Sequence, residues 1–105
     1  MNAQVFSVSQ VNVDEETLVT CRGEFDMMAA DRFHVAFEDV LGPEPNRIHI
    51  DCSGVSFIDS IGVKALMRAA RTCIAREIAL TMTPSEPMRR LFETIGVDPL
   101  FTYAP

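Results

Sequence analysis

A serine beside an aspartate, in the segment Asp59-Ser60-Ile61-Gly62, is the strongest candidate for chemistry in this chain. The apolar residues that follow recur at helical spacing and indicate that the segment opens a helix; they are Val63, Leu66, Met67, Ala70, Cys73 and Ile74. Ser60 is therefore expected at the N-cap of this helix. Two interpretations are open: Ser60 is only a capping residue, or its hydroxyl accepts a phosphate, which a helix N-terminus stabilises through its free N–H groups and dipole.

Enzymatic alternatives lack the side chains that they need. The segment 54–58 matches a nucleophile elbow only in its first three residues, because the second glycine is missing. Neither His34 nor His49 is placed by the sequence to serve Ser60 as a general base. A phosphate-accepting aspartate of the receiver type would need an acidic pair after an early strand and a lysine late in the chain, whereas the only lysine is Lys64. We therefore expect a protein without enzymatic activity.

Composition restricts the class of partner. The 105 residues, 48% of them hydrophobic, fit a single domain over residues 1–105. A formal net charge of −6 argues against nonspecific binding to nucleic acid or to anionic lipid, and favours a partner with a basic surface. No signal peptide and no apolar stretch as long as a membrane span is evident. These features predict a cytoplasmic protein without membrane insertion.

The cysteines and histidines do not form a metal-binding pattern. Cys21, Cys52 and Cys73 are far apart and odd in number, which favours reduced, buried thiols. There is no C-x-x-C pair, and the two histidines lack ligand spacing. We expect no metal and no cofactor.

The periodicity of apolar residues predicts the order β-β-α-β-α-β-α-β. Asp26 is a candidate N-cap for the first helix and Ser85 for the third, which Gly96 ends. The strands are expected at 5–13, 17–22, 48–52, 78–83 and 100–103, and the helices at 28–41, 60–76 and 85–95, with 54–58 as a connection.

Polar residues alternate with apolar ones along the third and fourth expected strands. His49 and Asp51 lie on one side of the third strand, and Thr81 and Thr83 on one side of the fourth. Parallel strands that are covered on both faces usually lack such alternation. We therefore expect an α/β fold with a mixed, mostly parallel sheet of four to five strands in sequence order. The helices should lie mainly on one face, with the other face partly wet.

A basic stripe runs along the second helix, where Lys64, Arg68 and Arg71 are spaced i, i+4 and i+7. Such a stripe is either a solvated face opposite the apolar one or a surface that meets acidic groups of a partner. The sequence leaves both possibilities open.

The chain resembles the STAS domain of anti-sigma factor antagonists over most of its length. The first motif is a glycine–glutamate–hydrophobic–aspartate turn before the first helix, and the second is a hydrophobic–Asp–Ser–x–Gly–hydrophobic motif at the start of the second. The third is the closing helix and tail. In this sequence they are Gly23-Glu24-Phe25-Asp26, residues 57–63, and residues 84–85 with 89–101. The sequence departs from the family at Ile61, where a small residue is frequent, and in the turn 75–77, which lacks a commonly seen glycine.

The resemblance implies a phosphorylation switch at Ser60. In such proteins the unphosphorylated form binds an anti-sigma factor that is a serine kinase and frees a sigma factor; phosphorylation blocks this, and a phosphatase restores it. The implied partner-binding residues are Asp26, Asp59, Ile61, Gly62 and Lys64. Among them, Asp59 would cap the helix and be recognised by the kinase, and Gly62 would permit close approach.

The resemblance also leaves a second role open, a STAS subunit of a lipid-transport ATPase complex or of a stressosome-like scaffold. In either role the chain is expected to be a monomer or a weak dimer.

Overall fold

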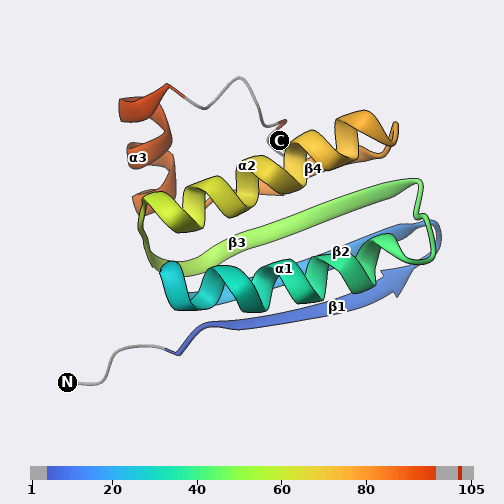
Figure 1. Ribbon diagram of the computed structural model, residues 1–105, viewed down its shortest axis with the longest axis horizontal. Helices are drawn as coiled ribbons and strands as arrows, with labels where there is room; N and C mark the ends of the chain where they lie inside the picture. The colour runs from blue at the N-terminus through green and yellow to red at the C-terminus, as the bar shows by residue number, and fades with distance from the viewer. Residues whose placement is uncertain (1–4, 97–101, 103–105) are drawn as a thin grey trace.

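Four strands and three helices make up the described part of the chain. The structure is a computed structural model and describes residues 5–96 and 102. Figure 1 shows the elements in chain order: β1 (Ser7–Val13), β2 (Glu16–Phe25), α1 (Met27–Leu41), β3 (Arg47–Ile58), α2 (Ser60–Ala75), β4 (Ala79–Thr83) and α3 (Glu86–Ile95).

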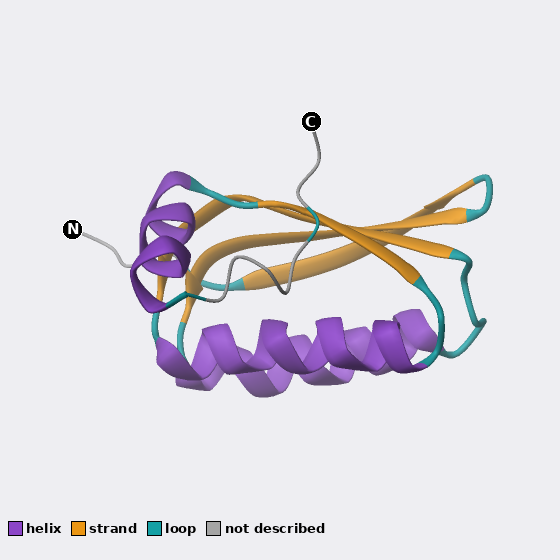
Figure 2. Ribbon diagram, turned by 90° about the horizontal axis from the view of Figure 1, so that it is seen from above, coloured by secondary structure: helices purple, strands orange, loops and turns teal. Residues whose placement is uncertain are grey.

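The strands form one mixed sheet in the order β1-β2-β3-β4. β1 pairs with β2 antiparallel, and the β2–β3 and β3–β4 pairs are parallel. Figure 2 shows α1 and α2 side by side on one face of the sheet, with α3 across one end. The predicted mixed sheet with helices mainly on one face is thereby confirmed. The expected strand at 100–103 lies outside the described residues except for Thr102, whose carbonyl accepts a 2.9 Å hydrogen bond from the Met82 N–H.

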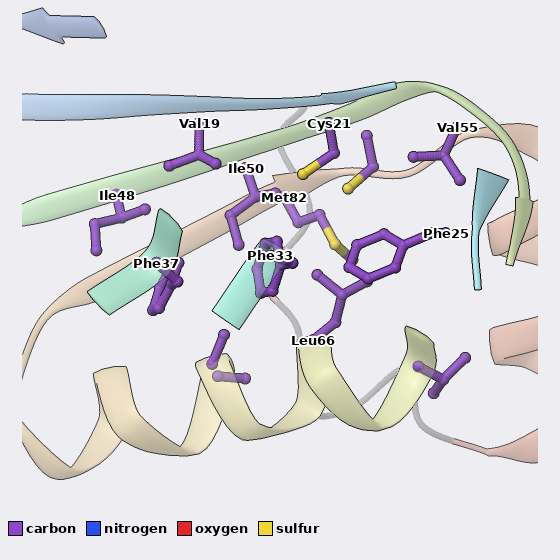
Figure 3. Close-up of a cluster of buried hydrophobic side chains, with 14 of the residues drawn as sticks. Val19, Cys21, Phe25, Phe33, Phe37, Ile48, Ile50, Val55, Leu66 and Met82 are labelled. Atoms are coloured by element: carbon purple, nitrogen blue, oxygen red, sulfur yellow. The ribbon is translucent and has the colours of Figure 1, made fainter. Parts of the chain in front are cut away.

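The core fills the space between the sheet and the two helices (Figure 3). Phe25 from β2 and Phe33 from α1 contact each other with ring centroids 5.2 Å apart, and Phe33 is 5.5 Å from Phe37. The side chains of Ile50 and Leu66 are fully buried from opposite sides of this layer. Burial of such side chains is the main stabilising contribution to the fold.

The three cysteines are free and buried, as expected. A hydrogen bond with Cys21, burial and the charge of Asp51 raise the pKa of the Cys52 thiol well above its ordinary value. Burial raises the pKa of Cys73 to about 11. The thiols of Cys52 and Cys73 therefore stay protonated at neutral pH, and all three buried cysteines act as small apolar core residues.

The sheet face away from the helices carries a polar cluster. His49 contacts Thr81 Oγ1 through Nδ1 at 2.6 Å and Thr83 Oγ1 through Nε2 at 3.0 Å. Partial burial acts to raise the pKa of Asp51, but two hydrogen bonds from Ser53 and the charges of His49 and Arg22 act to lower it, and the net pKa lies below its ordinary value. His49, Thr81, Thr83 and Asp51 are half-buried, which fits the expected partly wet face.

The predicted connection at 54–58 is wrong, because β3 continues as a strand to Ile58. Pairing with β2 persists to the Phe25–Ile58 pair through two register shifts. The buried residues in this part of β3 are Cys52, Val55 and Ile58, which are three apart. A bulged strand loses the alternation that identifies a regular one, so the sequence pattern did not extend to this segment.

Candidate functional site

The candidate site lies where α1 and α2 begin, side by side at the ends of β2 and β3 (Figure 1). The Asp59 carboxylate connects the two helices: Oδ1 accepts from the Gly62 N–H at 2.8 Å and Oδ2 from the Met27 N–H at 3.1 Å. Each of these N–H groups lies in the first turn of a helix and has no partner within that helix. One carboxylate therefore holds both helix N-termini at the same level.

Asp59, and not Ser60, is the N-cap of α2. The expectation that Ser60 caps the helix is wrong, whereas the capping role given to Asp59 is confirmed. Ser60 is instead the first residue of the helix. The carboxylate of Asp59 has two oxygen atoms that can accept hydrogen bonds, whereas a serine hydroxyl has one. The two oxygens of Asp59 accept separately from the first turns of the two helices.

Because Asp59 caps α2, the hydroxyl of Ser60 is not needed as a capping group and faces solvent. Its side chain is exposed, and within residues 5–96 and 102 its hydroxyl has no hydrogen-bond partner. It follows Asp59 directly and lies in the first turn of α2, close to free backbone N–H groups and the positive end of the helix dipole. The arrangement presents a hydroxyl that another protein can reach.

Gly62 allows α2 to start against the end of β2. A Cβ at this position would lie 2.2 Å from the Phe25 carbonyl oxygen and 2.9 Å from Ile58 Cγ1, far closer than atoms in contact approach. Gly62 is buried, so the structure gives it an internal packing role, and the close approach it permits is between elements of this chain.

Asp26 is the N-cap of α1, as predicted, and its Oδ1 accepts from the Ala29 N–H at 3.0 Å. It precedes Met27, whose N–H is held by Asp59. The two capping carboxylates therefore lie at the same end of the molecule as Ser60, and this end is acidic.

Apolar side chains are exposed around this acidic end. Ile61 is 38% exposed, Phe57 at the end of β3 is 50% exposed, and Met27 is 64% exposed. Phe57 and Met27 were not among the predicted site residues. Their position in the sequence, directly beside the motifs that carry Ser60 and Asp26, was the one feature that could have identified them. Their exposure could not be predicted, because the fold decides which apolar side chains stay on the surface. We call Met27, Phe57 and Ile61 the apolar rim.

A groove of about 320 Å³ runs between α1 and α2 and begins at Ile61. Lys64 lines it one turn beyond Ser60 and is exposed. The structure thus brings together four of the predicted residues at the surface, with Gly62 beneath them; the four are Asp26, Asp59, Ile61 and Lys64.

The histidines are engaged elsewhere. His49 contacts two threonines of β4, and His34 lies 3.8 Å from Glu38 on α1. Among the described residues, no group of three or more histidine, cysteine or acidic side chains is arranged to hold a metal ion. No described helix has both the length and the apolar character that a membrane span requires.

Replacing Asp59 with alanine is expected to destabilise the protein by about 1–2 kcal/mol, because the first turns of both α1 and α2 lose an acceptor. Denaturant unfolding measures this change. Asp26→Ala is the matched control, since it removes the cap of α1 alone and should cost about 1 kcal/mol. A smaller loss for Asp59→Ala than for Asp26→Ala would contradict the shared-cap geometry.

The chain combines a mixed sheet covered mainly on one face with two helix N-termini that meet beside an exposed serine. The family model described as Mlab, STAS domain matches residues 8–102, and the chain belongs to this STAS domain family. A search of curated proteins gave no match.

Solved structures share the fold over nearly the whole chain. An anti-sigma factor antagonist from Mycobacterium paratuberculosis superposes with a TM-score of 0.85 at 26% identity, covering 96% of this chain and 86% of that one. The anti-sigma factor antagonist SpoIIAA in its unphosphorylated form has a TM-score of 0.75 at 21% identity, covering 96% and 89%. The phosphorylated form of SpoIIAA, from Bacillus, has a TM-score of 0.70 at 22% identity, covering 96% and 92%.

A transport-related protein shares the fold as well. A sulfate transporter family protein from Wolinella succinogenes has a TM-score of 0.73 at 21% identity, covering 89% of this chain and 80% of that one. The fold therefore occurs in regulators and in transport proteins alike.

Proposed function

We propose that this protein is an anti-sigma factor antagonist that binds an anti-sigma factor serine kinase and thereby frees a sigma factor. In this proposal phosphorylation of Ser60 ends the binding, a phosphatase restores it, and the chain itself catalyses no reaction. The observation that carries the proposal is the exposed hydroxyl of Ser60 beside Asp59, at the meeting point of two helix N-termini.

In the proposed mechanism, a phosphate on Ser60 adds negative charge to the surface around the N-terminus of α2. A phosphate adds about −1.5 to −2 charges at neutral pH. The N-terminus of α2 tolerates this charge in the free protein, since its backbone N–H groups and dipole favour an anion. A partner that covers Ser60 must instead remove the phosphate from water beside Asp59 and Asp26, and the complex loses affinity.

The relatives support the same assignment. The Mycobacterium protein, at 26% identity, is described as an anti-sigma factor antagonist, and SpoIIAA is known in phosphorylated and unphosphorylated forms. The Asp-Ser pair of this chain stands at the start of α2, where a phosphate would alter the surface without entering the core.

The apolar rim is proposed as the contact surface for the unphosphorylated state. Truncating Phe57 to alanine should weaken kinase binding about tenfold or more, because apolar anchors at the centre of an interface contribute more than 1 kcal/mol each. Isothermal titration calorimetry with the kinase measures the change. Ile74→Ala is the matched control, since Ile74 is 67% exposed near the far end of α2 and should leave the affinity unchanged. Equal losses for the two variants would remove the rim from the interface.

Co-purification from the native cells tests the function itself. The proposal predicts that a kinase-like ATPase co-purifies with this chain and that a sigma factor is recovered with the kinase. The second candidate function is a STAS subunit of a lipid-transport ATPase complex or of a stressosome-like scaffold, and the matching family model, described as Mlab, STAS domain, fits this role as well. Recovery of a transporter subunit with this chain, and of no kinase, would establish that candidate instead.

A further inference from the structure

The α1–α2 groove has walls of opposite charge. Its α1 side carries Asp31 and Glu38, and its α2 side carries Lys64, Arg68 and Arg76. All five residues are exposed. Within residues 5–96 and 102, no ion pair joins an acidic residue of α1 to a basic residue of α2. Glu38 lies 3.8 Å from His34 of its own helix, and the charges that face the other wall are available to an occupant of the groove.

One charge of each wall, Asp31 on α1 and Lys64 on α2, lies at the same height along the groove. α1 and α2 each connect two parallel strands and run in the same direction (Figure 1). Asp59 holds their first turns together. Counted from Met27 and from Ser60, Asp31 and Lys64 are each the fifth residue of their helix. At a rise of about 1.5 Å per residue, equal counts correspond to equal heights.

We propose that the occupant is a second copy of this chain, docked face to face about a two-fold axis that runs along the groove. This rotation exchanges the two walls and keeps the helix direction, so α1 of each copy lies over α2 of the other. Asp31 then faces Lys64 of the second copy at the same height, and Glu38 faces the stretch just beyond Arg68. An isologous contact forms each of these pairs twice.

The alternative two-fold axis, perpendicular to the groove and in the plane of this face, is disfavoured by the same charges. It would place α1 over α1 and α2 over α2, and like charges facing each other oppose association. The floor of the groove adds little apolar surface to the contact, because Phe33, Phe37 and Ala69 are already buried in the core and only Ala65 is partly exposed. The area is small and each exposed ion pair is weak, so a weak, concentration-dependent dimer is expected.

Charge reversal and mixing test this arrangement by sedimentation equilibrium of the full chain. The double variants Asp31→Lys with Glu38→Lys, and Lys64→Glu with Arg68→Glu, each place like charges across both contacts. Each should raise the dimer dissociation constant about tenfold or more. An equimolar mixture of the two variants pairs lysine with glutamate at both contacts and should restore the dimer as a heterodimer.

A matched control separates these contacts from the effect of net charge. The double variant Glu15→Lys with Glu93→Lys changes the net charge by the same amount as Asp31→Lys with Glu38→Lys, but at exposed positions outside the groove. This control should dimerise at least as well as the original chain. A monomeric original chain at several hundred micromolar, or a mixture that stays monomeric, would overturn the proposal. If the chain is monomeric and the variant Lys64→Glu with Arg68→Glu loses kinase binding, the α1–α2 groove binds the kinase and not a second copy. The sedimentation experiment itself uses neither kinase nor phosphate, so the presence or absence of the dimer is decided independently of the proposed function.

Discussion

Phosphorylation of Ser60 is expected to weaken kinase binding by about two to four orders of magnitude. The hydroxyl lies at the exposed start of α2, bordered by Asp59 and the apolar rim. A partner that covers this surface would remove the phosphate from water beside the carboxylates of Asp59 and Asp26, and an uncompensated buried charge costs about 3–5 kcal/mol. Calorimetric titration of the phosphorylated and unphosphorylated protein into the kinase gives the two affinities.

Substitutions separate charge from the loss of the hydroxyl. Ser60→Ala should bind the kinase constitutively, because no capping hydrogen bond is lost, and Ser60→Asp should bind poorly. Ser9→Asp is the matched control, because Ser9 is an exposed serine on β1 and its replacement should leave the affinity unchanged. Equal affinities for Ser60→Ala and Ser60→Asp would refute a charge-operated switch.

Gly62→Ala is expected to destabilise the fold by about 3 kcal/mol, the largest stability effect that we predict for one methyl group. The new Cβ would lie 2.2 Å from the Phe25 carbonyl oxygen, and because that atom belongs to the backbone, the start of α2 must move away from β2. Overpacking of this kind costs about 1–3 kcal/mol, and more where the backbone must shift. For a domain of this size the midpoint of thermal unfolding should fall by about 10–20 °C.

The control for this prediction is Gly54→Ala. A Cβ at Gly54 would lie 2.9 Å from Arg22 Cγ, but this atom belongs to the flexible side chain of an exposed residue, which can move. The thermal midpoint should change by only a few degrees. A similar loss of stability at the two glycines would show that the close approach at Gly62 is not what the fold requires.

Features set by a few neighbouring residues could be predicted from the sequence. The caps at Asp26 and Ser85 and the left-handed Gly96 after α3 are observed, because each depends on one side chain and the next turn of the backbone. The alternation around His49 and Thr81 correctly indicated a sheet covered mainly on one face. The strand order followed from short connections and right-handed crossovers.

Features set by distant contacts could not be predicted. Serine and aspartate are both good N-caps, and what distinguishes Asp59 is its second bond, to the N–H of Met27, 32 residues away. The exposure of Phe57 depends on where β3 ends, which a bulge obscures.

Glu77, in the turn where the family commonly has glycine, adopts φ of 58°, a left-handed conformation that glycine adopts without strain.

The central claim, a switch at Ser60, is tested most directly by peptide mass spectrometry of the protein isolated from its own cells under growth and under stress, with phosphatases inhibited. We expect a single phosphate on Ser60 whose occupancy changes with the condition. Complete absence of phosphate from Ser60 in every condition, together with a stable transporter or scaffold partner, would contradict it and leave Ser60 as an exposed first residue of α2.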